Sequence, residues 1–312
     1  MNRRNFLSFI GAGIFFSLFT GCGETSKKSL PNENKIEGRN FTVDDIKLNS
    51  GYKMPVIGLG TWTLSDKTAA DCVYHALKIG YRLIDTAQYY GNEIGVGEGI
   101  KRAIDEKICT REEIFLTTKV MPGNYRQPDD AIKNSLKKLN LDYVDLFLIH
   151  QPGYNDDGVY KALERGVKNK IIRSIGISNY YTPKDFERIL NISEIVPAVV
   201  QNENHPLYQN TKLQEYLKKY GTVIESWYPL GGRGNTKKIF ENPVIKKIAE
   251  AHKKSSAQII LRWQIQADYI AIPGSGNFEH IEENFNIFDF ELSASEMQEI
   301  FSLNQNKRFE NW

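Results

Sequence analysis

Four polar residues at or just beyond the ends of short apolar runs could together carry out acid chemistry: Asp85, Tyr90, Lys119 and His150. A tyrosine has an ordinary pKa of about 10, and a lysine ammonium beside the phenol favours the phenolate and lowers that pKa. An aspartate supplies the counter-charge that a buried ammonium needs. A histidine can donate a hydrogen bond to the oxygen that the tyrosine protonates. The four residues predict a site that polarises a carbonyl, with Tyr90 as its general acid.

A carbonyl held in this way still lacks a reductant. Because no amino-acid side chain supplies a hydride, the predicted site implies a nicotinamide cofactor. Each of the four residues also has an ordinary structural interpretation, since an aspartate at the end of a strand often caps a helix and a tyrosine often packs. The elements that position these residues must decide between the two interpretations.

Short apolar runs alternate with amphipathic segments after residue 40. The runs are VIGLG (56–60), YRLID (81–85), IFLTTK (114–119), YVDLFLIH (143–150), IIRSIGIS (171–178), PAVVQ (197–201), TVIESW (222–227) and YIAIPGS (269–275). They lack clean alternation, as expected of strands buried on both faces. Helical spacing appears in 68–80, 129–140, 182–190 and 256–266. This order predicts an α/β fold, a parallel (β/α)8 barrel.

The carboxyl ends of the strands of such a barrel lie at one face, where these folds carry their chemistry. Seven of the runs end in polar residues, an aromatic residue or a glycine turn, namely Asp85, Lys119, His150, Ser178-Asn179, Gln201, Trp227 and Pro273-Gly274-Ser275. The alternative is an open doubly wound sheet, which would show GxGxxG in its first turn. GVGEGI (95–100) has a different spacing and lies in a helical pattern, so we favour the barrel.

Additional elements flank the predicted barrel at both ends. The segment 41–60 shows an apolar alternation broken by Asn49-Ser50-Gly51, which predicts an N-terminal β-hairpin. The segment 291–305 predicts an extra C-terminal helix that packs on the outside. We therefore assign residues 41–312 to a single barrel domain.

The composition excludes several classes of protein. The chain of 312 residues is 41% hydrophobic and 25% charged, with a net charge of +2, and no basic run is interleaved with aromatic residues. We therefore expect a globular protein that does not bind nucleic acid. Three cysteines are too few for a disulfide framework, and the five histidines show no metal-ligand spacing, so we expect no metal. We expect a monomer.

The N-terminus differs in character from the rest of the chain. Two arginines precede an uncharged stretch from residue 5 to 23, which is typical of a signal peptide. RRNFL resembles a twin-arginine export motif, and LFTGC resembles a bacterial lipobox in which Cys22 is lipidated. We predict a signal peptide over 1–22 and a polar tether over 23–40. The protein would then be an exported lipoprotein on the periplasmic or cell-surface side; an uncleaved N-terminal anchor is the alternative.

On these motifs, residues 41–312 resemble the aldo-keto reductase family. The matches occur in order: GLGTW (58–62), DTAQYYGNE (85–93), TTKV (117–120), LIHQP (148–152), IGISN (175–179), QNENHP (201–206), PLG (229–231) and IPGS (272–275). The resemblance implies that Asp85, Tyr90, Lys119 and His150 form the catalytic tetrad. It also implies NAD(P)H-dependent reduction of small aldehydes or ketones, with sugar-derived carbonyls among the candidates.

The resemblance also assigns residues to the cofactor and the substrate. Cofactor contacts are implied at Thr61, Ser178, Asn179, Gln201, Trp227, Leu230, Gly231, Ser275, Glu283 and Asn284. Trp227 would stack on the nicotinamide, and the last two residues would contact the adenine end. Trp62 and Gln151 would line the substrate pocket. Gln151 stands where many members have tryptophan, which makes that pocket more polar.

Two departures from the family pattern bear on the choice of cofactor. Family members usually carry lysine where Gly274 stands and arginine where His280 stands, and those two cations bind the 2'-phosphate of NADPH. A glycine cannot do so, and a neutral histidine binds phosphate weakly. The cofactor is therefore NADPH or NADH, with the preference left open.

Two other classes of protein stay open at this point. A non-catalytic or weakly catalytic barrel could bind the cofactor as an auxiliary subunit or sensor, although a complete tetrad favours the enzyme. A barrel glycosidase would need paired carboxylates, and Asp85 and Glu225 both lie near strand ends. Lys119 has no role in a glycosidase, so we favour the reductase.

Overall fold

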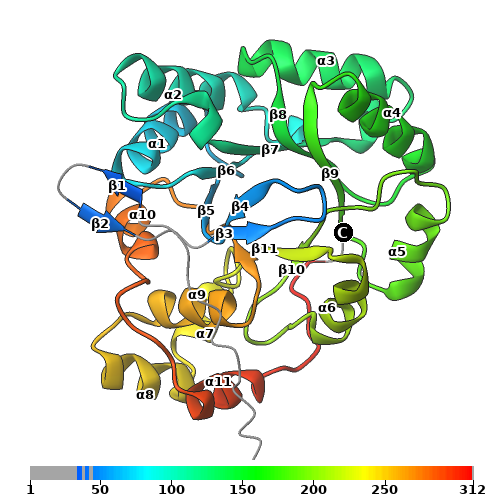
Figure 1. The fold of residues 1–312 in the computed structure, drawn as a ribbon. Coiled ribbons are helices and arrows are strands. Elements are labelled where there is room, and N and C mark those ends of the chain that lie inside the picture. The colour runs from blue at the N-terminus through cyan, green and yellow to red at the C-terminus, as the bar shows by residue number, and fades with distance from the viewer. Residues whose placement is uncertain (1–33, 37–38, 42–44, 311–312) are drawn as a thin grey trace, which may run out of the picture. The chain divides into compact units, whose positions relative to one another are not determined.

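The computed structural model describes residues 34–36, 39–41 and 45–310. Its main sheet is a set of parallel strands that follow one another in chain order around a barrel (Figure 1). These strands are β5 (Gly58–Gly60), β6 (Leu83–Asp85), β7 (Phe115–Val120), β8 (Val144–Ile149), β9 (Ile172–Ser178), β10 (Val199–Glu203), β11 (Val223–Trp227) and β12 (Ile270–Ala271). All eight apolar runs thus contain a strand, and the predicted (β/α)8 fold is confirmed.

The first and last strands of the sheet meet. Gly60 N donates to Pro273 O at 3.1 Å, and Ala271 N donates to Val56 O at 2.9 Å. Every residue of β7 and β8 is buried, because each strand has the barrel interior on one side and a helix layer on the other. This explains why these runs lack the apolar–polar alternation of a half-exposed strand.

Helices connect the strands and cover the outside of the barrel (Figure 1). They are α1 (Asp66–Ile79), α2 (Glu93–Asp105), α3 (Pro128–Leu139), α4 (Asp156–Lys168), α5 (Pro183–Leu190), α6 (Thr211–Leu217), α7 (Thr236–Phe240), α8 (Pro243–His252), α9 (Ser256–Gln266), α10 (Phe278–Phe285) and α11 (Ala294–Phe301). Short 3-10 turns lie at Gln88–Tyr90, Arg111–Glu113, Pro122–Asn124 and Lys218–Tyr220. The predicted extra C-terminal helix is α11, which packs against α8.

Local sequence signals set the ends of these helices. Thr182 caps α5 by accepting from the Asp185 backbone N–H, while the Asp185 carboxylate accepts from Thr182 N. Ser65 caps α1 in the same position, and α1 ends at Gly80 with φ of 117°, a left-handed conformation that glycine adopts readily.

The glycines of GVGEGI serve helix packing. A Cβ atom on Gly95 would lie 1.9 Å from Asp66 O at the start of α1, and one on Gly97 would lie 2.3 Å from Leu139 O at the end of α3. Glycine therefore lets α2 approach both neighbouring helices closely. The segment is therefore a helix-packing motif and not a dinucleotide-binding loop, as its spacing predicted.

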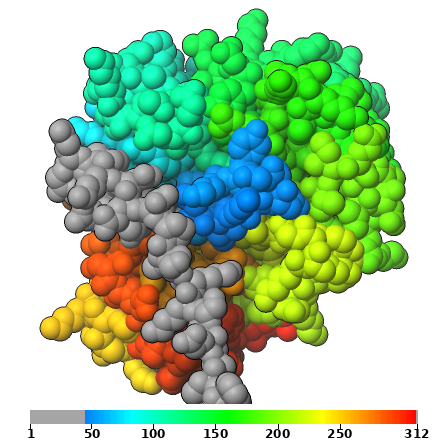
Figure 2. Space-filling view, viewed as in Figure 1, coloured from blue at the N-terminus to red at the C-terminus, as the bar shows by residue number. Residues whose placement is uncertain are grey.

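A hairpin of β3 (Asp45–Lys47) and β4 (Lys53–Pro55) lies across the amino-terminal ends of the barrel strands. Its turn carries Asn49, whose Nδ2 donates to the Pro197 and Tyr220 carbonyls at 3.2 Å each. Leu48 and Met54 pack on the apolar residues at that end of the barrel. Figure 2 shows this hairpin in blue in the middle of the view. The predicted hairpin is confirmed, and the opposite end of the barrel is left for the site.

The N-terminal predictions lie mostly outside the described residues. These are the signal peptide over 1–22, the lipidation of Cys22 and most of the tether. The end of the segment predicted as a tether forms an antiparallel pair, β1 (Asn34–Ile36) with β2 (Arg39–Phe41). Across the described part of the chain, no helix combines the length and apolarity that a bilayer span requires.

Candidate active site

Lys119 contacts two of the other three predicted catalytic residues, Asp85 and Tyr90. From β7, its Nζ donates to Asp85 Oδ1 at 2.7 Å, to Thr86 O at 3.0 Å and to Tyr90 OH at 3.0 Å. Lys119 and Asp85 are buried, and Asp85 closes β6. Tyr90 follows β6 in a 3-10 turn and is half-buried. The ammonium therefore has its three protons directed to three oxygens, one of which belongs to the phenol.

The electrostatics of this group differ in one respect from the sequence-based prediction. Burial lowers the pKa of Lys119, but Asp85 and Tyr90 together raise it above its ordinary value, so the ammonium stays charged. Lys119 does lower the pKa of Tyr90, as predicted. Desolvation of the phenol outweighs that effect and, with the charge of Asp85, raises the pKa of Tyr90 to about 12. The predicted effect of Lys119 is therefore present, but the loss of hydration of the phenolate, which the sequence-based prediction did not include, decides the net shift.

His150 lies directly after β8 and presents its ring to Tyr90. The two ring centroids are 5.7 Å apart with an interplanar angle of 79°, an edge-to-face arrangement. Burial, with a smaller contribution from the Lys119 charge, lowers the pKa of His150 to about 3. The ring is therefore neutral at physiological pH and has a single N–H to donate. Its buried Nδ1 has no hydrogen-bond partner among the described residues.

Asn92 fixes the loops on which these residues stand. Its Nδ2 donates to Thr61 O at 2.8 Å and to Leu64 O at 3.0 Å, and its Oδ1 accepts from the Thr86 hydroxyl at 2.8 Å. The loop after β5 is thereby tied to the loop after β6. Asn92 lies within DTAQYYGNE, but the sequence indicated no role for it, since only the fold brings these two loops together.

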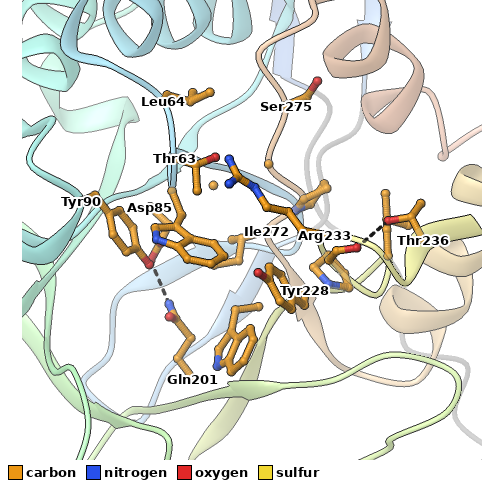
Figure 3. Close-up of a pocket in the computed structure, with 18 of the residues that line it drawn as sticks. Thr63, Leu64, Asp85, Tyr90, Gln201, Tyr228, Arg233, Thr236, Ile272 and Ser275 are labelled. Atoms are coloured by element: carbon orange, nitrogen blue, oxygen red, sulfur yellow. Dashed lines mark hydrogen bonds between the residues drawn. The ribbon is translucent and has the colours of Figure 1, made fainter. Parts of the chain in front are cut away.

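A cavity of about 860 Å³ opens over the carboxyl ends of the strands. Figure 3 shows Tyr90, Asp85 and Gln201 on one side of it, with Arg233 pointing into it from the loop after β11. Predicted site residues that line it are Asp85, Tyr90, His150, Ser178, Asn179, Gln201, Trp227, Leu230, Ser275, Glu283, Asn284, Trp62 and Gln151. The structure thus brings together segments from both ends of the barrel sequence.

Three of the predicted site residues do not line this cavity. Lys119 lies beneath it, behind Asp85 and Tyr90. Thr61 is buried and its hydroxyl donates to Asp85 O at 2.9 Å, which makes it part of the support for β6. Gly231 turns the loop after β11 with φ of 89°. A cofactor contact at Thr61 or Gly231 stays a prediction.

The residues assigned to the nicotinamide meet at the ends of β9, β10 and β11. Asn179 has φ of 67°, which is uncommon outside glycine and is often retained at functional sites. Its Nδ2 donates to His150 O at 2.9 Å. Gln201 Nε2 donates to Asp85 Oδ2 at 2.8 Å and to Glu225 Oε2 at 2.7 Å. Both amide N–H groups are thus in use, and Gln201 Oε1 is the atom that can accept from a ligand.

The donor set fits a nicotinamide cofactor. The Ser178 hydroxyl oxygen accepts from Asn179 Nδ2 at 3.2 Å and keeps its own proton to donate. Trp227 is the last residue of β11, and its buried Nε1 has no hydrogen-bond partner among the described residues. A carboxamide needs both acceptors and donors, and Gln201 Oε1 and the Ser178 hydroxyl offer one of each.

Aromatic residues surround the entrance beside Tyr90. Trp62 lies 6.5 Å from Tyr90 and 5.5 Å from Tyr228 between ring centroids. Tyr89, Met121 and Tyr228 also line the cavity, and sequence reasoning did not select them. Tyr89 precedes Tyr90 in DTAQYYGNE, so its place near the site could have been inferred from that motif, whereas Met121 and Tyr228 belong to none of the matched motifs.

Arg233 was not among the predicted site residues. Of the lysines and arginines in the described part of the chain, it is the one that lines the cavity. Its guanidinium lies 5.9 Å from the Trp62 ring centroid, and among the described residues no carboxylate lies within ion-pair distance of it. Gly232 and Gly234 on either side have φ of 67° and 79°. The left-handed glycines turn the loop so that the arginine between them can reach the cavity.

The remaining reactive side chains lie outside the site. Cys72 and Cys109 are free thiols buried in the helix layer. Within the described residues, no group of three or more His, Cys, Asp and Glu side chains could hold a metal ion.

Comparison with known proteins agrees with this geometry. The model of the aldo/keto reductase family matches residues 56–305. The NAD(P)H-dependent D-xylose reductase I,II of Candida tropicalis is 41% identical over 308 residues, covering 86% of this chain and 94% of the relative. The glyoxal reductase of Bacillus subtilis is 42% identical over 271 residues, with 85% and 94% covered.

A solved structure extends the comparison to the fold and the cofactor. The aldo-keto reductase of Bombyx mori in complex with NADP superposes with a TM-score of 0.81 at 32% identity, over 87% of this chain and 96% of that one. This chain therefore belongs to the aldo/keto reductase family and is an NAD(P)H-dependent oxidoreductase.

Proposed function

We propose that this enzyme reduces small aldehydes or ketones to alcohols, with Tyr90 as the proton donor. The observation that carries the proposal is the Tyr90 hydroxyl, which lines the cavity and accepts from Lys119 Nζ at 3.0 Å. A pKa of about 12 keeps Tyr90 protonated at physiological pH, so it can act as an acid. The same contact stabilises the phenolate that remains after the proton has moved.

Each tetrad residue has one task in this chemistry. When bound, the nicotinamide cofactor supplies the hydride that the carbonyl carbon accepts. Tyr90 breaks its O–H bond and protonates the carbonyl oxygen, while Lys119 keeps its charge through Asp85 at 2.7 Å. Neutral His150 can donate its single N–H to the same oxygen, which orients the carbonyl toward Tyr90.

The lining of the cavity supports a small and polar substrate. Trp62, Tyr89 and Tyr90 give aromatic walls, and Gln151 adds an amide next to His150. The names of the relatives fit this class, since one acts on D-xylose and another on glyoxal. We propose dicarbonyls and short sugars as the first compounds to test.

The test follows NADPH and NADH oxidation with glyoxal, methylglyoxal, xylose, benzaldehyde and simple ketones. Turnover of at least one carbonyl, with the matching alcohol as product, supports the proposal. Tight cofactor binding without turnover of any compound would instead favour an auxiliary or sensor protein that uses a reductase-like barrel.

We also propose that the enzyme is exported and anchored through lipidated Cys22. Support comes from the RRNFL and LFTGC motifs of the sequence. A reductase needs its nicotinamide cofactor, which is made in the cytoplasm, and a twin-arginine route would let the barrel cross folded with the cofactor bound. Stable attachment would need the several acyl chains that bacterial lipoproteins carry, because one chain anchors only marginally.

Fractionation with mass spectrometry of the N-terminal peptide tests this localisation. An acylated peptide that begins at Cys22 is expected, whereas an intact Met1 peptide on a cytoplasmic protein contradicts the proposal. In an Arg3→Lys, Arg4→Lys variant, export should fail if the twin-arginine route is used.

A further inference from the structure

A second carboxyl group lies inside the barrel beside the tetrad and has no part in the chemistry described above. Glu225 stands in β11 and pairs in register with Gln201 on β10. Its side chain is fully buried. Oε2 accepts from Gln201 Nε2 at 2.7 Å, while Oε1 is buried without a hydrogen-bond partner among the described residues.

Gln201 bridges this carboxyl group to the catalytic one. Its Nε2 donates to Asp85 Oδ2 at 2.8 Å as well as to Glu225 Oε2. Two acids thus share one amide, and the orientation of that amide decides which atom of Gln201 faces the cavity. If Glu225 were replaced by an apolar residue, one N–H of Gln201 would be left unpaired.

The charges of this cluster do not balance if both acids are ionised. Lys119 provides one ammonium, and it contacts Asp85 at 2.7 Å. No lysine or arginine of the described residues forms an ion pair with Glu225. A second ionised carboxylate in a dry interior is strongly unfavourable, so the uncompensated acid retains its proton. Burial, followed by the charge of Asp85, raises the pKa of Glu225 to about 8.

The groups that face Glu225 can be named element by element. Gln201 faces it from β10, Asp85 from β6, and Lys119 from β7, with Tyr90 just beyond β6. On the other side, β12 pairs Ile270 with Glu225, and neither residue of that strand titrates. Ionisation of Glu225 raises the pKa of Tyr90, because a second negative charge disfavours the phenolate.

We propose that Glu225 is a positioning residue that holds Gln201 and stays protonated in the active enzyme, so that Tyr90 can release its proton. The inference rests on the proposed role of Tyr90. Once Glu225 ionises, the phenolate faces a second carboxylate as well as Asp85, and reduction slows. Glu225 would thus set the alkaline limit of carbonyl reduction through the charge around Tyr90.

The experiment compares wild type with Glu225→Gln, which imitates the protonated acid. Single-turnover reduction rates are measured across pH with cofactor bound, so that product release does not mask the chemical step. The wild-type rate should fall about threefold to tenfold as pH rises through about 8, which corresponds to a change of up to about one pK unit on Tyr90. Glu225→Gln should keep the wild-type rate at low pH and lose this fall.

A matched control is Glu164→Gln on α4, a buried acid that accepts from the Glu194 and Ile195 backbone N–H groups far from Tyr90. In Glu164→Gln, the reduction rate should still fall as pH rises through about 8, because this substitution does not change the charge near Tyr90. A fall that persists in Glu225→Gln, or a flat wild-type profile, overturns the inference. If Glu225→Gln does not fold, the infrared measurement on the wild type described below makes the test, because it needs no variant.

Infrared spectroscopy separates this inference from the proposed function. Wild type at neutral pH should show the carbonyl stretch of a protonated carboxyl group, lost at alkaline pH and absent from Glu225→Gln. Absence of that band in wild type overturns the inference even if reduction is observed. The band together with no reduction of any carbonyl would leave Glu225 protonated as inferred and would refute the role of Tyr90.

Discussion

The two sides of the cavity are built in different ways. On the side of β6, β7 and β8, the catalytic groups are buried or half-buried, and Lys119 directs its three protons to three oxygens. On the side of β11 and β12, the cavity is lined by the glycine-rich loop at 230–236 and by residues 274–284. There Arg233 is exposed and contacts an aromatic ring rather than an acid.

This difference separates two properties of the enzyme. The proton chemistry depends on a network in which every partner is fixed by another, so a single change should disable it. We expect the choice of cofactor to depend on a few exposed side chains that can be replaced one at a time. Mutations on the two sides should therefore differ in size and in kind.

Tyr90→Phe should show the largest effect. Removal of the hydroxyl takes away the proton donor, and general acid catalysis is typically worth about a hundredfold to ten-thousandfold in rate. Cofactor affinity should hardly change, because the lost group contacts Lys119 rather than the residues assigned to the nicotinamide. Steady-state kinetics and cofactor titration by fluorescence check both points. Wild-type turnover of every substrate would show that another group is the acid.

The Asp85–Lys119 pair should show the next largest effect. Lys119→Met leaves Asp85 buried without its cation, which should lower the free energy of unfolding by about 3–5 kcal/mol. The double variant Asp85→Asn, Lys119→Met should recover much of that stability and none of the activity. Denaturant unfolding of the single and double variants measures the coupling.

A surface pair supplies the control for this experiment. Lys247, which is exposed, contacts the half-buried Glu299 at 2.9 Å, and Lys247→Met should cost about 1 kcal/mol or less. If Lys119→Met were no more destabilising than Lys247→Met, the Asp85–Lys119 pair would not be the organising contact of the site.

The same division explains what could be predicted from the sequence. The eight strands were predictable from the buried apolar runs, and so was the proximity of Asp85, Lys119 and His150, because these residues stand at the ends of neighbouring strands. The rise in the pKa of Tyr90 was not, because the balance between desolvation and Lys119 depends on three-dimensional burial. Tyr228 lies in a loop whose residues show no periodicity, so the sequence could not place it in the cavity.

Arg233→Ala should have a moderate effect, confined to binding. The guanidinium is a cation on the loop side of the cavity, next to Leu230 and Gly231, where the resemblance implies contacts to the cofactor. A hydrogen bond to a charged group is worth about 1.5–3 kcal/mol, so the Kd of the dinucleotide should rise about tenfold while the rate at saturation stays close to wild type. Lys237→Ala is a matched control, because Lys237 is an exposed cation of α7 outside the cavity lining.

Comparison of ligands separates the possible partners of Arg233. A rise in Kd for both NADPH and NADH would assign Arg233 to a phosphate that the two share, and a rise for NADPH alone would assign it to the 2'-phosphate. Unchanged affinity for both, with a higher KM for anionic carbonyls only, would place Arg233 against the substrate and contradict the cofactor assignment.

The smallest effect should come from His280, at the adenine end of the cavity. Gly274 has no side chain that could bind a phosphate, and Glu283 from α10 adds a carboxylate to the same lining. This region therefore offers little attraction for the 2'-phosphate of NADPH. His280→Arg adds a fixed cation on an exposed helix position, where a new contact is worth about 1 kcal/mol. The ratio of the Kd for NADH to that for NADPH should then rise about fivefold, measured by fluorescence titration.

The control is His280→Gln, which keeps a hydrogen-bonding side chain but lacks the charge that arginine adds. This variant should leave the ratio of the two Kd values unchanged. An unchanged ratio in His280→Arg would mean that position 280 does not face the 2'-phosphate. The preference between NADPH and NADH would then depend on the loop that carries Arg233.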